Sequence, residues 1–246
     1  MVRRRRSDFI KAIINDGAKR LPQIFNIQSS IINSPPPAEP GWEVWYMKTS
    51  NIIIMAASIL MFFLIAPAFG GSAAFKDNIY DPGKLKPVDS KLKVNVGDLA
   101  PDFTLPSVGG QKIRLSQYRG QKNVMISFVP AAWTPVCSDQ WPGYNIVNEM
   151  FDENDAVLIG ITVDNIPTLY AWTQQMGNLW FPVLSDFWPH GAVADKYGVL
   201  RSDGVSERAL FFIDKEGVIR DIRVNDINKR PDLAYCAANL EKMHKK

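Results

Sequence analysis

Apolar and polar residues follow two different patterns along this chain of 246 residues. Residues 52–69 form one almost continuous apolar run. Residues 75–95 are polar, with prolines and a glycine, which is typical of a linker. From residue 96 onward, short apolar runs of strand length alternate with helical patterns and turn residues. The pattern therefore predicts a linker at 75–95 and a folded domain at 96–246.

Inside the predicted domain, the runs at 123–129 and 155–163 have the length and continuity of buried central strands. Helical patterns follow them at 136–154 and 167–176. The rest of the domain is expected to contain a short strand at 183–186, a helix at 191–197, a hairpin with strands at 208–214 and 218–224, and a final helix at 232–243.

The order of these elements joins a strand–helix–strand unit to a hairpin followed by a helix, which is the order of the thioredoxin fold. We therefore expect an α/β domain with a central mixed sheet flanked by helices. The segment 96–115, which contains a Gly-Gly turn, predicts additional strands at the N-terminus of the domain.

Charge and cysteine content exclude several classes of function. The chain has a net charge of +3, but residues 74–246 hold 20 basic and 21 acidic side chains. A nearly neutral domain gives no electrostatic footprint for a nucleic acid. The chain has two cysteines, Cys137 and Cys236, too few for a disulfide scaffold, and no Cys/His cluster has the spacing of a zinc site.

The apolar run has the features of an export or anchor segment. Lys48 precedes it and small residues follow it, which is the order of a secretory signal peptide across residues 47–74. Residues 29–44, with four prolines, resemble no helix or strand, and residues 1–46 are expected to be unstructured and to be a mis-assigned extension if translation starts at Met47. If Met1 is the true start, residues 48–69 are a transmembrane anchor with the basic run 3–6 on the cytoplasmic side. Either reading predicts an extracytoplasmic, periplasmic domain that meets the membrane only through this segment.

The residue with the strongest chemical signal is Cys137. The strand at 123–129 leads through Pro130 and Thr134 to this cysteine, which lies in the first turn of the next predicted helix. Backbone N–H groups and the helix dipole favour negative charge there, and therefore the reactive thiolate. Thr134, three residues earlier, can present its hydroxyl to the sulfur. Pro135 suits a helix start, where no backbone donor is needed.

The spacing of Pro130, Thr134 and Cys137 matches P-x-x-x-T-x-x-C, and here the chain resembles the peroxiredoxin family, of the alkyl hydroperoxide reductase and thiol-specific antioxidant type. The resemblance extends from residue 96 to residue 243. Arg208 begins the strand RALFFID, where the family carries its fourth active-site residue.

The resemblance implies a thiol-dependent peroxidase acting on hydrogen peroxide and organic hydroperoxides. Cys137 would attack the peroxide and become a sulfenic acid, and Arg208 would stabilise the thiolate and the leaving oxygen. Thr134 would orient the peroxide, and Pro130 would shield the oxidised sulfur. No metal or organic cofactor is implied. The implied partners are an external thiol reductant, such as a thioredoxin-like protein or a small thiol, and a second copy of the chain in a homodimer.

The resolving step departs from the family pattern. Family members that form a disulfide between subunits resolve with a cysteine beyond the last helix, and in another branch it lies five residues after the first cysteine, where this chain has Pro142. Cys236, inside the last predicted helix, is the candidate resolving residue; it pairs with Cys137, pairs between subunits, or is an inert buried thiol. We expect a one-cysteine mechanism.

Two other functions remain open. A membrane-tethered or periplasmic thioredoxin-like thiol–disulfide oxidoreductase needs C-x-x-C, and Thr134 occupies the first cysteine position of that motif. A non-catalytic binding domain is the second alternative, because a fold does not imply a function.

Overall fold

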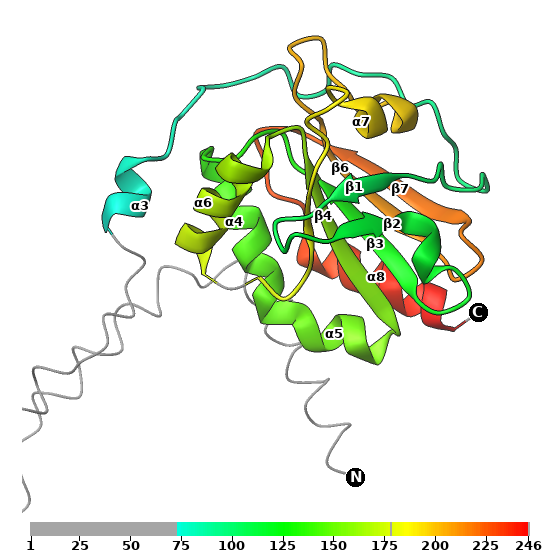
Figure 1. Cartoon of the computed structure of the whole chain (residues 1–246). Coiled ribbons are helices and arrows are strands. Elements are labelled where there is room, and N and C mark those ends of the chain that lie inside the picture. The colour runs from blue at the N-terminus through cyan, green and yellow to red at the C-terminus, as the bar shows by residue number, and fades with distance from the viewer. Residues whose placement is uncertain (1–72, 178, 246) are drawn as a thin grey trace, which may run out of the picture. The chain divides into compact units, whose positions relative to one another are not determined.

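The computed structural model describes residues 73–177 and 179–245, beginning with the short helix α3 (Ala73–Asp77) (Figure 1). The predicted extension at 1–46 and the apolar run at 52–69 lie outside these residues. Within the described part of the chain, no helix is both long enough and apolar enough to cross a membrane.

The centre of the structure is a sheet of five strands in the order β5-β4-β3-β6-β7. The middle strand β3 (Asn123–Phe128) runs parallel to β4 (Ala156–Thr162) and antiparallel to β6 (Arg208–Ile213). At the edges, β5 (Val183–Ser185) is parallel to β4, and β7 (Ile219–Asn225) is antiparallel to β6. This order confirms the predicted thioredoxin-like sheet.

The predicted N-terminal strands are also present. β1 (Thr104–Pro106) and β2 (Lys112–Arg114) form a separate antiparallel pair, followed by the 3-10 helix η2 (Leu115–Tyr118). The Val108 N–H donates to the carbonyl of Val183 at 2.9 Å, which ties the turn of this pair to the edge of the central sheet.

The prediction of one continuous helix at 136–154 is wrong. The structure divides it into α4 (Pro135–Gly143), the 3-10 helix η3 (Tyr144–Val147) and α5 (Asn148–Glu153). Pro142 lies inside α4, and proline removes a helical hydrogen bond and crowds the preceding turn. The chain tightens directly afterwards, since the Tyr144 N–H bonds to the carbonyl of Trp141, three residues back.

The remaining helices have clear start and stop signals. α6 (Ile166–Met176) is capped by the Asn165 side chain, which accepts from the Thr168 N–H at 2.9 Å. α7 (Ala192–Tyr197) ends at Gly198, whose φ of 72° favours glycine. The last helix is α8 (Leu233–His244).

Alternation along the strands separates the two faces of the sheet. Val124, Ile126 and Phe128 of β3 belong to a core that also includes residues of α7 and of the N-terminal strand pair. The intervening positions face the other side, where the Trp141 indole of α4 reaches Ser127 and the Tyr235 ring of α8 contacts Phe212. Residues 208, 210 and 212 of β6 share one face. The first residue of β6 therefore points toward the face that carries α4.

The contact between α4 and β4 generates a prediction about stability. A methyl group added at Gly160 of β4 would lie 2.8 Å from Cζ2 of Trp141 and 3.1 Å from Cε2 of Phe181. Trp141 is fully buried and contacts the Trp172 ring, tilted by 40°, at a centroid distance of 5.1 Å, so close packing opposes its displacement. We expect Gly160→Ala to lower the free energy of unfolding by about 1–3 kcal/mol, measured by urea denaturation.

Gly109→Ala is the matched control, because a methyl group there would lie an ordinary 3.6 Å from the Ser107 hydroxyl. The control should change the unfolding free energy by less than about 0.5 kcal/mol. Equal unfolding midpoints for both variants would contradict tight packing of α4 on the sheet.

Candidate active site

Cys137 is the third residue of α4 and lies in its first turn. The preceding loop reverses direction at Trp133, whose φ of 61° is left-handed, and Thr134 is the N-cap of the helix. The first helical hydrogen bond runs from the Ser138 N–H to the Thr134 carbonyl at 2.9 Å. The N–H of Cys137 therefore belongs to the open end of the helix, where negative charge is favoured. The side chain of Cys137 has no exposed surface.

The Arg208 guanidinium is the nearest charged group to this sulfur. Its Nη2 donates to Cys137 Sγ at 3.4 Å, its Nη1 donates to Gln140 Oε1 at 2.5 Å, and its Nε donates to the Ile227 carbonyl at 3.1 Å. Only 2% of Arg208 is exposed. A planar guanidinium with three fixed acceptors has one orientation, so its positive charge is held beside the sulfur.

The loop before α4 brings the other predicted residues to the same place. Pro130 is buried at the end of β3. The Thr134 hydroxyl donates its one proton to the Ala131 carbonyl at 2.9 Å, rather than to the sulfur. Its remaining capacity is as an acceptor, so an incoming molecule with an O–H group can donate to it. The structure thus gives Thr134 a different bond from the one that its spacing to Cys137 suggested.

Two residues of the site were missed by sequence reasoning. Gln140 contacts Arg208, and its position three residues after Cys137 places both on one helix face, a signal that was available in the sequence. Asp164 supports the loop: its Oδ2 accepts from the Ala132 N–H at 2.8 Å and from the Thr162 hydroxyl at 2.6 Å. Asp164 follows the neighbouring strand β4, and no local pattern links it to the loop.

The segment predicted as a linker, residues 75–95, follows the rim of this site. The Tyr80 N–H donates to the carbonyl of Trp133 at 2.8 Å, next to Thr134. The Ile227 N–H donates to the Pro87 carbonyl at 3.0 Å, and the carbonyl of that same Ile227 holds Arg208. Residues 75–95, called the connector below, therefore bond to two of the segments that surround the guanidinium and the sulfur.

A buried carboxylate makes the third attachment of the connector. Glu207 precedes Arg208 and is fully buried. Its Oε1 accepts from the N–H groups of Asp89 and Ser90 at 2.6 and 2.8 Å. Its Oε2 accepts from Nη1 of Arg201 at 2.9 Å. The start of β6 is thus fixed from the connector side as well as from the sheet.

Cys236 lies in the interior of α8 and is fully buried. Burial raises the pKa of the Cys236 thiol to about 12, with a further contribution from the Asp232 carboxylate. At neutral pH it is therefore a protonated thiol, which is neither a nucleophile nor a metal ligand. Among the described residues, no group of three or more His, Cys, Asp or Glu side chains is placed to hold a metal ion.

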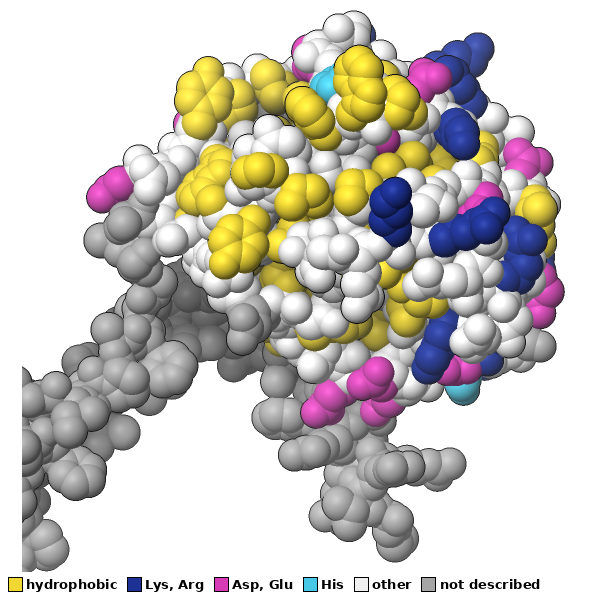
Figure 2. All heavy atoms as spheres, viewed as in Figure 1, with side chains coloured by type: hydrophobic (Ala, Val, Ile, Leu, Met, Phe, Trp, Pro, Cys, Tyr) yellow, Lys and Arg dark blue, Asp and Glu magenta, His cyan; other side chains and the backbone are white. Residues whose placement is uncertain are grey.

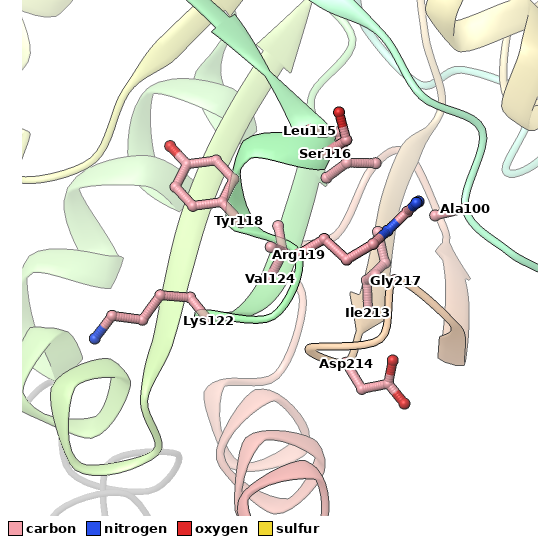
Figure 3. Close-up of a pocket in the computed structure, with 10 residues that line it drawn as sticks. All are labelled: Ala100, Leu115, Ser116, Tyr118, Arg119, Lys122, Val124, Ile213, Asp214 and Gly217. Carbon is pink, nitrogen blue, oxygen red and sulfur yellow. The ribbon is translucent and has the colours of Figure 1, made fainter.

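The small hollow drawn in Figure 3 lies at the other end of the sheet. Val124 and Ile213, which pair across β3 and β6, line it, whereas Arg208 lies at the opposite end of β6. Asp214, at its margin, bonds to Arg220 and to the backbone of the following turn. These bonds of Asp214 hold the hairpin between β6 and β7, and the hollow is separate from the cysteine site.

The fold and the site define a thioredoxin-like protein with a cysteine held beside an arginine. The sequence model of the AhpC/TSA family matches residues 96–222, which include Pro130, Thr134, Cys137 and Arg208. This chain therefore belongs to the AhpC/TSA family, the peroxiredoxins, and is a thiol-dependent peroxidase in its general class. Cys236 lies outside the matched residues.

Individual relatives agree with this membership. The chain is 41% identical over 128 residues to alkyl hydroperoxide reductase E of Mycobacterium tuberculosis, covering 52% of this chain and 83% of that protein. It is 36% identical over 146 residues to the chloroplastic 2-cysteine peroxiredoxin of Chattonella marina var. antiqua, covering 56% of this chain and 74% of that one.

Among solved structures, the reduced 2-Cys peroxiredoxin of Plasmodium vivax matches with a TM-score of 0.57 and 27% identity, over 60% of this chain and 81% of that chain. AhpC of Mycobacterium tuberculosis matches with a TM-score of 0.55 and 22% identity, over 60% of this chain and 92% of that chain, which shows the common fold.

The attachment of the connector through Glu207 generates a second prediction. Glu207→Ala removes the acceptor for two connector N–H groups and leaves the Arg201 guanidinium, only 3% exposed, without this partner. We expect the free energy of unfolding to fall by about 3 kcal/mol or more, because one partner of a buried pair is lost. Urea denaturation at neutral pH measures this loss. Glu207→Gln, which keeps a carbonyl acceptor, should lose less.

Lys93→Ala serves as a control, because Lys93 and Asp195 form an ion pair in which both side chains are more than half exposed. Removing an exposed pair should cost less than about 1 kcal/mol. If Glu207→Ala unfolds at the same urea concentration as Lys93→Ala, the connector is not held by this carboxylate.

Proposed function

We propose that Cys137 is the peroxidatic cysteine and that the protein reduces hydrogen peroxide and organic hydroperoxides through a sulfenic acid on this residue. The observation that carries the proposal is the 3.4 Å contact between Arg208 Nη2 and Cys137 Sγ at the N-terminus of α4. Two sources of positive potential, a guanidinium and a helix end, meet at one buried sulfur. Membership in the peroxiredoxin family favours this function over disulfide exchange and over a non-catalytic binding role.

In the proposed reaction, the thiolate attacks one oxygen of the hydroperoxide. A sulfur–oxygen bond forms and the oxygen–oxygen bond breaks, so that sulfur is oxidised and the peroxide is reduced. The leaving oxygen takes a proton and departs as water or an alcohol. The negative charge that moves from sulfur to this oxygen stays within reach of Arg208, which can stabilise both positions.

The loop residues have supporting roles in this proposal. The Thr134 hydroxyl donates its proton to the Ala131 carbonyl. Its oxygen can therefore accept a hydrogen bond from the O–H group of the peroxide and orient the peroxide. The N–H groups of Val136 and Cys137, at the open helix end, are donors for the reacting oxygens. Pro130, buried beside the loop, would shield the oxidised sulfur from further attack.

We further propose a one-cysteine cycle, in which an external thiol reductant, a thioredoxin-like protein or a small thiol, reduces the sulfenic acid. The location of Cys236 supports this choice. It lies inside a helix, is fully buried, and has a thiol pKa raised to about 12 by burial. A protonated thiol in a packed helix can resolve Cys137 only after that helix opens.

The proposal includes an exported or membrane-anchored homodimer outside the cytoplasm. The export reading is supported by the apolar run at 52–69. For the dimer, the support is a set of exposed aromatic side chains, with Trp188 exposed to 82% and Phe187 to 47%. Figure 2 shows hydrophobic side chains gathered on the face that carries α6. Trp172 and Phe181, by contrast, are buried and belong to the core.

Intact-mass measurement after one equivalent of hydrogen peroxide tests the proposed nucleophile. We expect a rapid gain of one oxygen in the natural chain and in Cys236→Ser, and no gain in Cys137→Ser. The added oxygen should persist until an external thiol is supplied. A subsequent loss of two hydrogens, absent in Cys236→Ser, would replace the one-cysteine cycle by resolution through Cys236. If no oxygen is added within minutes, the peroxidase proposal fails for this residue.

Arg208→Lys tests the electrostatic part of the proposal. Lysine keeps the positive charge but cannot hold three acceptors in one plane, so the cation would no longer be fixed beside the sulfur. We expect the second-order rate constant for hydrogen peroxide to fall by about 100-fold, the usual loss when a fixed donor at a developing negative charge is removed. Stopped-flow measurement gives this rate. Arg223→Lys, at an exposed arginine, should leave it unchanged; an equal rate in both variants would contradict the role of Arg208.

A further inference from the structure

A buried polar cluster lies behind the Arg208 guanidinium, between β3 and the end of α4. Its members are Ser127, Gln140 and Tyr144, all of them buried. Polar side chains are costly in such a place unless they bond to one another. Neither the sequence motif nor the proposed reaction gives Ser127 or Tyr144 a role. Their hydrogen bonds indicate a role, because both residues bond to Gln140, and Gln140 bonds to Arg208.

The amide of Gln140 has a distinct partner for each of its groups. Its Nε2 donates to the hydroxyl oxygen of Tyr144 at 3.0 Å and to Oγ of Ser127 at 3.1 Å. Its Oε1 accepts from Nη1 of Arg208 at 2.5 Å. An amide nitrogen has two N–H donors, so both are used by the two hydroxyl groups. The carbonyl oxygen then faces the guanidinium.

The reverse orientation of this amide is disfavoured. If the amide turned over, Nε2 would face Nη1 of Arg208, and two donors would meet in a buried place without an acceptor between them. The guanidinium, which can only donate, therefore selects the orientation in which the amide carbonyl faces it, and the two hydroxyls hold the amide there by accepting from both of its N–H groups. Ser127 is itself held, since its Oγ also accepts from Nε1 of Trp141 at 3.3 Å.

We propose that Tyr144 and Ser127 are positioning residues of the peroxide reaction. They fix the amide of Gln140, and Gln140 in turn fixes Arg208 with its Nη2 on the sulfur of Cys137. This inference rests on the proposed function, because it takes Cys137 as the reacting group. It goes beyond that function by assigning a role to two hydroxyls that touch neither the sulfur nor the guanidinium through any described hydrogen bond.

The local fold explains why Tyr144 can reach this place. Pro142 and Gly143 end α4, and the tighter 3-10 turn of η3 begins at Tyr144 and leaves its ring buried. Burial raises the pKa of the Tyr144 phenol far above its ordinary value. The hydroxyl therefore keeps its proton over the working range of pH, and its bond to Gln140 is constant rather than a switch.

The test is Tyr144→Phe in the full-length chain, measured as the second-order rate constant for oxidation of Cys137 by hydrogen peroxide. Losing one of the two amide acceptors frees Gln140 and lets the guanidinium shift, and we expect the rate to fall by about tenfold. Tyr197→Phe is the matched control: this tyrosine is also buried and donates its hydroxyl to the Pro101 carbonyl at 2.9 Å, among the residues of the other core.

Introducing Tyr144→Phe into a Gln140→Glu variant separates a positioning role of Tyr144 from a packing role. In Gln140→Glu, both carboxylate oxygens are acceptors, so no orientation of this side chain turns a donor toward Arg208. Adding Tyr144→Phe to this background should change the rate by less than about twofold. The same background dependence is expected for Ser127→Ala, which provides the test if Tyr144→Phe does not fold.

Two results would overturn the inference: a rate equal to that of the natural chain in both Tyr144→Phe and Ser127→Ala, or an equal loss with glutamine and with glutamate at position 140. If the natural chain is not oxidised at Cys137 at all, the proposed function fails and this inference fails with it. The natural chain is measured in the same series, so the two failures are distinguished.

Discussion

The burial of one guanidinium constrains the rest of this structure. A buried cation is strongly destabilising unless its donors are satisfied and its charge is compensated. Arg208 meets the first condition with a carbonyl at the end of the sheet, an amide oxygen of α4 and the sulfur of Cys137. Those acceptors come from two separate parts of the chain, α4 and the loop after β7, and Arg208 itself begins β6. The positions of α4, of the start of β6 and of the loop after β7 are therefore fixed by the same group.

The second condition links folding to chemistry. The Ile227 carbonyl and the Gln140 amide are neutral, so they orient the guanidinium without compensating its charge. Among its hydrogen-bond partners, the sulfur of Cys137 is the one that can become an anion. The electrostatic cost of burying Arg208 is thus lowered when the cysteine is a thiolate. The same contact that satisfies a donor of Arg208 therefore also places its positive charge beside the sulfur of Cys137.

Much of the fold was predictable because it depends on local pattern. The central strands, the hairpin and their order follow from runs of apolar residues and turn residues, and β3 and β6 lie where those runs predicted them. The candidate residues Cys137 and Arg208 followed from a motif and a resemblance. The break after Pro142 was missed because the helical apolar pattern continues through it. The contacts of Asp89 and Ser90 with Glu207 span 118 and 117 residues, and no periodicity along the chain carries such information.

The connector, residues 75–95, contributes to the cysteine site although it lies outside the residues that match the family model. The family match begins at residue 96, yet residues before it bond to Trp133, Glu207 and Ile227. Each of these residues is next to, or in contact with, a member of the cysteine site. The frame that holds Arg208 against Cys137 therefore includes a segment from outside the common domain. In this chain, the geometry of the cysteine site therefore depends in part on hydrogen bonds from Tyr80, Pro87, Asp89 and Ser90, which precede the residues that match the family model.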